Sequence, residues 1–267
     1  MSWQKQLNEP LYPEIIWSRP ENRMSAGKLL IIGGNKFAIA APVNAYKYSF
    51  EAGVGSARVL MPEATHKAFG KIISEGYFAP SNLSGSFAKN ALAEWMAQAS
   101  WSDCVLLAGD LGRNSETSML VESFCDKYEG LLSISQDAIE CIYGFADKLI
   151  NRPNTTLVLS FAQMQKLATL AGSVKPFLHS SNLIQVIEAA EEFSKRTGAC
   201  TVFRFNDNLI ISLKGEVVTT PAPINKIWRV EAAAKASVWW LQNPNKQLET
   251  IVTSLMENSG VQDKTHA

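Results

Sequence analysis

The 267-residue sequence predicts an α/β protein with a doubly wound, mostly parallel sheet, helices on both faces and a late antiparallel edge. Short, continuously apolar runs, of which residues 28–32 are the first, are typical of strands buried on both faces of a parallel sheet. Helical stretches alternate with these runs along most of the chain. Three closely spaced strand patterns separated by polar turns begin at residue 199, and this spacing indicates antiparallel pairing.

Local signals mark where the expected elements end. The first strand stops at Gly33-Gly34, the helix after it breaks at Gly53, and the second strand ends at Pro62. Strands are expected at residues 28–32, 56–61, 103–108, 131–135, 155–159, 199–205, 209–213 and 216–220. Helices are expected at residues 40–52, 87–99, 115–128, 161–170, 182–196, 229–242 and 246–257. The pair Trp239-Trp240, which follows a run of alanines, is typical of a packed core helix.

All of these elements are expected to belong to one domain, residues 26–257. Residues 1–25 are expected to form an extended arm, because Pro10, Pro13 and Pro20 discourage regular structure. Residues 258–267 are polar and are expected to fray.

The charge and hydropathy of the chain argue against several classes of partner. The 25 basic and 25 acidic residues cancel, so no net field would gather nucleic acid or an anionic membrane surface. No apolar run approaches the roughly 18 residues of a membrane-spanning helix, and the first residues lack the apolar core of a secretory signal. We therefore expect a cytoplasmic protein with no nucleic-acid or membrane partner.

Neither the cysteines nor the histidines form a recognisable chemical motif. The histidines are His66, His179 and His266, and none of them stands at the end of an expected strand, so a histidine-activated nucleophile is not expected. The cysteines are widely spaced and form no CxxC pair, which indicates buried thiols rather than a metal or redox site. They are Cys104, Cys125, Cys141 and Cys200.

Ligands of a doubly wound sheet collect at the carboxyl ends of its parallel strands. This rule places Gly33-Gly34-Asn35, the 108–113 turn, the 135–137 turn and Ser160 around one crevice. Residues 33–36 offer N–H groups to a phosphate, but they lack the Gly-Lys-Ser/Thr ending of a P-loop, so a tight turn is favoured. The stretch around Asp110 contains Gly109 before it and Gly112 two residues after it. It is equally consistent with close approach of a ligand to the backbone and with a capped turn.

Two acids that follow the strand at 131–135 have two interpretations. Asp137 and Glu140 are consistent with a carboxylate pair near a bound metal. They are also consistent with acids in the first turn of a helix, where they complement the helix dipole, and this second interpretation is slightly favoured.

Taken in order, the stretches resemble the ADP- or ATP-dependent (S)-NAD(P)H-hydrate dehydratases, a branch of the ribokinase-like superfamily. GKLLIIGGNKFAIAAPVNAYKYSFEAGVGSARVLMPE is similar to the first strand, helix and second strand of that family. DCVLLAGDLGRNSET resembles its Asp-x-x-x-x-Gly-Pro-Gly-Leu-Gly turn. LLSISQDAIE, TLVLSFAQMQKL and ACTVFRFNDNLIISLKGEVVTT stand where the family has its Asp-Ala-Asp-Ala, His-Pro-Gly-Glu and Val-Leu-Lys-Gly motifs. The similarity spans about residues 26–257 and implies a ribokinase-like fold.

The resemblance also implies roles for individual residues and ligands. Glu231 would be the catalytic base, ADP or ATP with Mg²⁺ the cofactor, and NAD(P)H or its hydrate the other ligand. The implied substrate-binding residues are Ala41, Gly112 and Ser160. The implied nucleotide-binding residues are Arg204, Arg229 and Val230, and the other candidates are Asn35, Asp110 and Asp137. Members of the family often form homo-oligomers, so a second copy of the chain is a further expected partner.

The departures from the family's motifs concentrate on its chemistry. Trp228-Arg229-Val230-Glu231 replaces the family's Gly-Ser-Gly-Asp turn, so the glycines that allow close approach to phosphate are absent. Asp110 adds a negative charge where an anionic cofactor would approach. The remaining replacements are Ser160 for a histidine, Gln163 for a glutamate, Ser135 for an aspartate and Arg204 for a lysine.

These departures predict an impaired or non-catalytic descendant that binds a nucleotide or dinucleotide, or acts as an assembly partner. Two alternatives stay open. One is an active dehydratase that repairs hydrated NAD(P)H, and the other is a kinase of a small hydroxylated metabolite with Glu231 as base.

Overall fold

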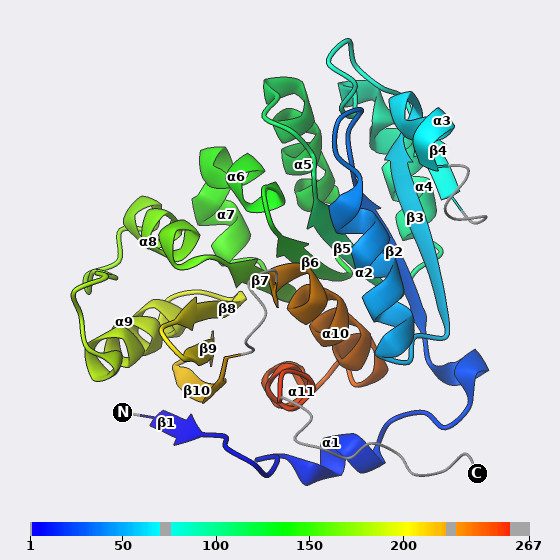
Figure 1. Ribbon diagram of the computed structural model, residues 1–267. Helices are drawn as coiled ribbons and strands as arrows, with labels where there is room; N and C mark the ends of the chain where they lie inside the picture. Colours follow the sequence, from blue (N-terminus) through cyan, green and yellow to red (C-terminus); the bar gives the residue numbers. More distant parts are fainter. Residues whose placement is uncertain (1, 70–75, 223–227, 257–267) are drawn as a thin grey trace.

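The computed structural model describes residues 2–69, 76–222 and 228–256. These residues form one ten-stranded sheet in the order β1-β10-β9-β8-β7-β6-β5-β2-β3-β4, with helices on both of its faces (Figure 1). The antiparallel pairs are β8 with β9 and β9 with β10. The predicted class, the doubly wound sheet and the late antiparallel edge are therefore confirmed.

The predicted strands are all present, to within one residue at either end. Two further strands, β1 and β4, lie at the two edges of the sheet and were not expected. The strands are β1 (Ser2–Lys5), β2 (Lys28–Gly33), β3 (Ser56–Pro62), β4 (Gly76–Ala79), β5 (Cys104–Gly109), β6 (Leu131–Ser135), β7 (Thr155–Leu159), β8 (Cys200–Phe205), β9 (Asn208–Leu213) and β10 (Glu216–Pro221).

Helices cover both faces of the sheet. They are α1 (Pro13–Trp17), α2 (Ala40–Glu51), α3 (His66–Phe69), α4 (Leu92–Ala99), α5 (Ser115–Lys127), α6 (Ala138–Cys141), α7 (Ala146–Ile150), α8 (Phe161–Leu170), α9 (Leu183–Lys195), α10 (Trp228–Gln242) and α11 (Gln247–Ser254). The short helices α1, α3, α6 and α7 were not expected. Helix α1 packs on α11.

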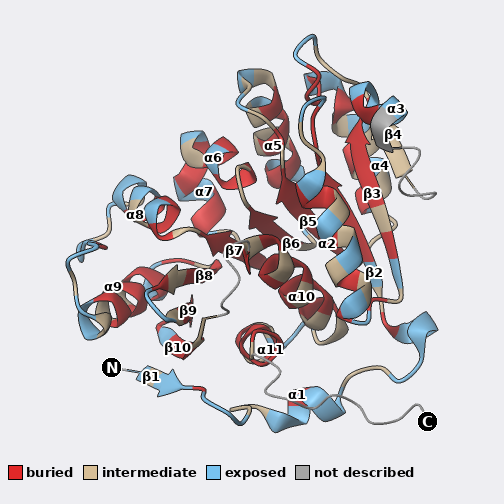
Figure 2. Cartoon of the chain, viewed as in Figure 1, coloured by how far each residue is buried: buried red, intermediate tan, exposed pale blue. Residues whose placement is uncertain are grey.

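Alternate residues of each central strand face opposite layers. Leu30 and Ile32 of β2 pack with residues of α4 to α9, whereas Leu29 and Ile31 pack with residues of α2, α10 and α11. All four side chains are fully buried, and Figure 2 shows the central strands as a buried layer between the helices. Burial on both faces explains why the sequence of these strands is continuously apolar.

The helix expected at residues 87–99 begins later than expected. Phe87 forms an isolated bridge with Ser81, and the α-helix starts only at Leu92, after a 3₁₀ turn. The fully buried ring of Phe87 packs edge-to-face on Trp95, with ring centroids 4.9 Å apart. Tertiary packing therefore keeps Phe87 extended where its apolar spacing predicted helix.

The amino-terminal arm contains more regular structure than expected. Pro13 is the first residue of α1, a position where proline is tolerated because its missing N–H would have no helical partner. Strand β1 pairs in parallel with β10. Gln6 is fully buried just after β1, and its side-chain Nε2 donates to the Val252 carbonyl of α11 at 2.9 Å. The arm is therefore bonded to the sheet edge and to the last helix.

The cysteines are all buried with free thiols, as predicted. His66 and His179 are exposed and contact phenylalanine rings in a tilted geometry, with ring centroids 4.6 Å apart in both cases. Trp240 is fully buried in α10, as expected of a core helix. Across residues 2–69, 76–222 and 228–256, no helix combines the length and the apolar character needed to cross a membrane.

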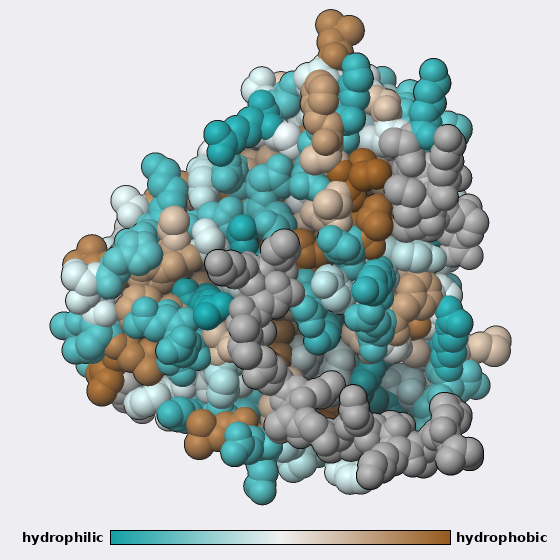
Figure 3. Space-filling model, viewed as in Figure 1, coloured by the Kyte–Doolittle hydropathy of each residue, from teal (hydrophilic) through white to brown (hydrophobic). Residues whose placement is uncertain are grey.

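The surface in Figure 3 is mostly hydrophilic, with apolar side chains in small separate groups. Two of the most exposed apolar residues are Phe37 and Leu83, at 84% and 110% of their reference areas. The expected homo-oligomer stays a prediction.

The buried amide of Gln6 generates a test of the arm. Gln6→Ala leaves the Val252 carbonyl without its donor, so we expect a loss of about 1–3 kcal/mol in the free energy of unfolding. Urea denaturation measures this loss. Gln4→Ala, at an exposed position of β1, is the matched control. Equal effects of the two substitutions would show that the arm does not contribute through Gln6.

Candidate functional site

The carboxyl ends of β7, β6, β5 and β2 lie next to one another in the sheet. The turns that follow these strands hold Ser160, Asp137, Asp110 and Asn35, so the predicted crevice brings these residues to one edge. Arg229 joins them from the first turn of α10, where its Nη1 donates to the Gln163 side chain at 2.8 Å.

The turn after β2 uses its own N–H groups. The amides of Gly34, Asn35 and Lys36 donate to backbone carbonyls of neighbouring segments at 3.0, 2.8 and 2.9 Å. A Cβ on Gly33 would lie 2.5 Å from the Gly109 carbonyl, so only glycine fits there. These bonds support a tight turn and leave no free donor among these three amides for a phosphate.

Asn35 ties this turn to the next one. Its side-chain Nδ2 donates to the Asp110 carbonyl at 2.6 Å, and its Oδ1 accepts the Phe37 N–H at 2.8 Å. Asn35 is buried, with both ends of its amide bonded. Its observed role is therefore to hold the turns after β2 and β5 together.

Asp110 has an unusual backbone and an unusual partner. Its φ is +58°, a left-handed conformation that is uncommon outside glycine. Its carboxylate Oδ2 accepts the Ala41 N–H at 2.7 Å, at the first turn of α2. Burial raises the pKa of Asp110, and the charge of Asp137 raises it further, whereas hydrogen bonding from the Ala41 and Ala40 amides opposes the rise. Ala41, an expected substrate contact, therefore gives its N–H to the protein's own carboxylate.

Asp137 supports the turn after β5. Its Oδ2 accepts the Gly112 N–H at 3.0 Å, and Gly112 has a φ of +76°. Glu140 points to solvent and pairs with the exposed Arg113 at 3.5 Å. The described residues hold no cluster of three or more histidine, cysteine or acidic side chains that would suit a metal ion. Glu140 lies in the first turn of α6, as the second interpretation expects, whereas Asp137 precedes the helix and its carboxylate is directed at the turn after β5.

Ser160 and Gln163 form a capping box at the start of α8. The Ser160 hydroxyl accepts the Gln163 N–H at 3.1 Å, and the Gln163 side chain accepts the Ser160 N–H at 3.0 Å. The Gln163 amide also donates to the Gln136 carbonyl at 2.8 Å. Ser160 and Gln163 stand where the dehydratases that the sequence resembles have a histidine and a glutamate. Both side chains are thus bonded within the protein.

Arg229 is half-buried and bonded to a neutral group. Burial lowers the pKa of its guanidinium, whereas the nearby charges of Asp137 and Glu140 raise it. No carboxylate of the described chain forms an ion pair with it. Its guanidinium lies next to the Gln163 amide, in the first turn of α8.

The other residues of the expected α10 turn have structural contacts. Trp228 and Val230 are buried, at 6% and 3% exposure. The Glu231 carboxylate pairs with Lys235, one turn later in the helix, at 2.6 Å. The segment just before Trp228, residues 223–227, lies outside the described residues.

Arg204 lies at the end of β8, beside the strand that leads to Ser160. Its Nε donates to the Asn206 carbonyl in the β8–β9 turn at 2.9 Å. The sequence analysis placed Arg113 and Gln136 at this edge, within the 108–113 and 135–137 turns, but did not anticipate that the Gln136 carbonyl accepts the Gln163 amide. The Ser160-x-x-Gln163 spacing is a recognisable capping-box signal, and it would have indicated the role of Gln163.

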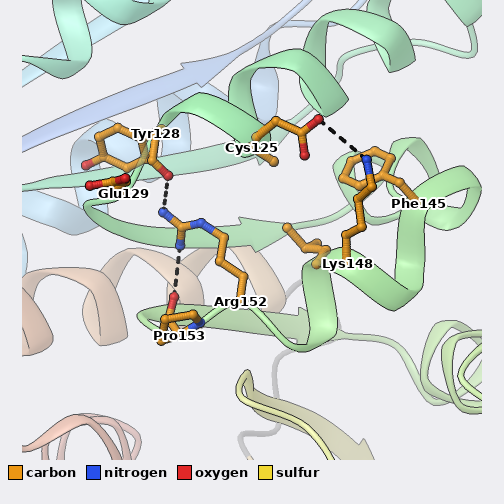
Figure 4. Close-up of a pocket in the computed structure, with 9 residues that line it drawn as sticks. Cys125, Tyr128, Glu129, Phe145, Lys148, Arg152 and Pro153 are labelled. Atoms are coloured by element: carbon orange, nitrogen blue, oxygen red, sulfur yellow. Dashed lines mark hydrogen bonds and ion pairs between the residues drawn. The ribbon is translucent and has the colours of Figure 1, made fainter.

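A cavity of about 470 Å³ lies near the amino-terminal ends of β6 and β7, next to α5 and α7 (Figure 4). It is therefore at the end of these strands opposite to the candidate site. Cys125, Phe145 and Leu149 are among the residues that line it. Arg152 donates to backbone carbonyls around it, including that of Gly130 at 2.8 Å, and Lys148 pairs with Asp126 at 3.7 Å. None of the predicted site residues lines this cavity, and its cations are already engaged, so it does not add to the site.

Comparison with known proteins gives no match to a family model and none to a curated protein sequence. Solved structures do match. A ribokinase-like superfamily protein from Enterococcus faecalis superposes with a TM-score of 0.69 at 15% identity, covering 95% of this chain and 85% of that one. A hypothetical protein from Streptococcus mutans gives 0.67 at 16% identity, covering 91% and 85%.

The Bacillus subtilis ADP/ATP-dependent NAD(P)H-hydrate dehydratase, co-crystallised with ATP and Mg²⁺, gives a TM-score of 0.64 at 11% identity and covers 92% of this chain and 86% of that one. At such identities the similarity shows a common fold. The chain therefore has a ribokinase-like fold, as its sequence predicted.

The shifted pKa of Asp110 generates a pH-dependent prediction. The pKa is raised above the ordinary 3.8, so the folded protein binds this proton more readily than the unfolded chain does. The stability gained from this protonation is complete below the ordinary pKa and is lost as the pH rises through the folded-state pKa. At neutral pH we expect Asp110→Asn, whose amide oxygen still accepts from Ala41, to be more stable than the wild type.

The gain should be no more than about 1 kcal/mol, since solvent screens a partly exposed charge. It should shrink as the pH is lowered toward about 4, because the wild type then binds the proton. Urea denaturation at the two pH values measures it, with Asp207→Asn, at an exposed turn position, as control. An advantage that grows on acidification would contradict the prediction.

Proposed function

We propose that this chain is a ribokinase-like protein that binds a nucleotide or dinucleotide at the carboxyl edge of its sheet and has lost the phosphoryl-transfer and dehydration chemistry. The observation that carries the proposal is the contrast between Arg229 and the other polar groups of the crevice. Arg229 is a half-buried cation bonded to a neutral amide. Asp110, Ser160, Gln163 and Glu231 are bonded within the protein, whereas Asp137 Oδ1 is buried without a partner among the described residues.

Arg229 supports anion binding. A guanidinium presents several donors in a plane and remains charged even when burial lowers its pKa, so it suits phosphate groups. Its place beside the carboxyl ends of β6 and β7 is where ligands of doubly wound sheets lie. The B. subtilis dehydratase, which shares this fold, was co-crystallised with ATP and Mg²⁺.

The lost chemistry is supported by the state of the expected base. Glu231 Oε1 pairs with Lys235 at 2.6 Å within its own helix, so Glu231 could act as a base only through Oε2 or after this pair is rearranged. A general base must reach the proton that it removes with a free lone pair in the right direction. Ser160 and Gln163 are likewise closed on each other in the capping box.

The described residues do not fit a Mg²⁺ ion. Magnesium requires several oxygen ligands in octahedral geometry, with one or two carboxylates among them. Asp110 Oδ2 caps α2, and Asp137 Oδ2 accepts the Gly112 N–H. Asp137 Oδ1 is buried without a partner among the described residues, but one such oxygen does not supply the several ligands that the ion requires. We therefore assign no step of a reaction to this ion, and the proposed binding rests on Arg229 alone.

Ligand-dependent stabilisation tests the binding. We expect ADP, ATP or NADPH, at about 100 times its Kd, to stabilise the fold by about 2.7 kcal/mol, which thermal unfolding detects as a shift of several degrees. The panel also includes AMP and NAD⁺, each with Mg²⁺. Arg229→Ala should remove most of the shift because it removes the phosphate-facing cation. Arg113→Ala, an exposed arginine at the same edge, should leave it unchanged.

Two outcomes contradict separate halves of the proposal. If no member of the panel shifts the transition, the protein does not bind a nucleotide at this edge. If the wild type dehydrates hydrated NADPH or phosphorylates a small metabolite, and Glu231→Ala abolishes that turnover, one of the two active alternatives is correct and the loss of chemistry is wrong.

A further inference from the structure

The carboxylate of Asp110 lies where the protein would otherwise present free amides to an anion. Asp110 follows β5, and its Oδ2 reaches the Ala41 N–H at the start of α2, 69 residues earlier in the chain, at 2.7 Å. The residue that precedes α2, Ile39, supplies no side-chain cap. The amino terminus of this helix is therefore capped by a carboxylate from a different strand end.

This cap is not needed to hold the two turns together. The Gly34 N–H donates to the Gly109 carbonyl at 3.0 Å, and Asn35 Nδ2 donates to the Asp110 carbonyl at 2.6 Å. Both of these bonds use the backbone of the β5 turn, so they would survive a change of the Asp110 side chain. The carboxylate itself adds only the contact with α2.

The position also costs free energy, and glycine would avoid that cost. Asp110 has a φ of +58°, and the same turn contains two glycines with positive φ, Gly109 at +111° and Gly112 at +76°. The carboxylate is partly buried and lies within the electrostatic reach of Asp137. Strained residues that the surrounding structure holds in place concentrate at functional sites, which motivates a functional role for this one.

We propose that Asp110 is an internal anion that closes the α2 end of the crevice to phosphate groups and so determines where the charged part of a ligand can lie. It occupies the amide donors at the start of α2, and its negative charge repels a second anion. The phosphates are then confined to the side of the crevice formed by α8 and α10, where Arg229 lies. This last step rests on the proposed nucleotide binding, whereas the closure by Asp110 does not.

Removing the side chain should reopen the amides to an external anion. In Asp110→Gly, formate is a probe that matches the missing carboxylate in size and charge. We expect sodium formate to raise the melting temperature of this variant by several degrees relative to sodium chloride at equal ionic strength, and to leave the wild type unchanged. Inorganic phosphate should bind the variant about tenfold more tightly than it binds the wild type, as titration calorimetry measures.

Asn154→Gly is the matched control. Asn154 also has a positive φ, +55°, and precedes β7 at the opposite edge of the sheet. Its replacement relieves a similar backbone strain without touching α2, so formate and phosphate should have no effect beyond that on the wild type. Equal responses of Asp110→Gly and Asn154→Gly would overturn the proposal.

Asp110→Asn keeps the proposal testable if the glycine variant does not fold. Its amide oxygen still occupies the Ala41 N–H but carries no charge, so formate should have no effect while phosphate binds more tightly than to the wild type. If phosphate binds both proteins equally, Asp110 does not exclude it. The formate and phosphate measurements do not require the wild type to bind a nucleotide. They therefore test the role of Asp110 even if the proposed nucleotide binding is wrong.

Discussion

Burial of the central strands on both faces is the constraint on which the rest of this structure depends. Leu29 to Ile32 are fully buried between two helical layers, and the neighbouring strands are covered in the same way. The central strands β2, β5, β6 and β7 accordingly carry a single charged residue, Lys28, at the start of β2. Because the central strands are parallel, the turns after them meet at one edge, where Asn35 bonds to Asp110 and Gln163 bonds to Arg229 although each pair is far apart in sequence.

At that edge the protein bonds several of its polar groups internally, while Ser135 Oγ and Asp137 Oδ1 are buried without a partner among the described residues. Asp110 bonds to α2, Asp137 to Gly112, and Gln163 to both Ser160 and Gln136. A buried polar group without a partner costs about 1–3 kcal/mol, so a site that no longer relies on a ligand gains stability from such internal bonds. Arg229 differs from these groups because a neutral amide bonds its charge without neutralising it.

Some features of the edge could be read from local sequence. The Ser160-x-x-Gln163 box and the Glu231–Lys235 pair each involve residues three or four positions apart, which helix geometry brings together. The Asp110–Ala41 contact could not be read, since it joins segments 69 residues apart through the packing of two turns. Strand β1 was missed for a related reason, because short polar edge strands lack the apolar runs that mark buried ones.

The local order of apolar and turn residues was thus sufficient to establish the strands, most of the helices and the class of the sheet, since each depends on interactions within a few positions. The roles of the polar residues at the crevice depended on the tertiary structure. Whether a carboxylate such as Asp110 faces a ligand or caps a helix depends on which turn packs against it, and sheet order and long-range packing decide that.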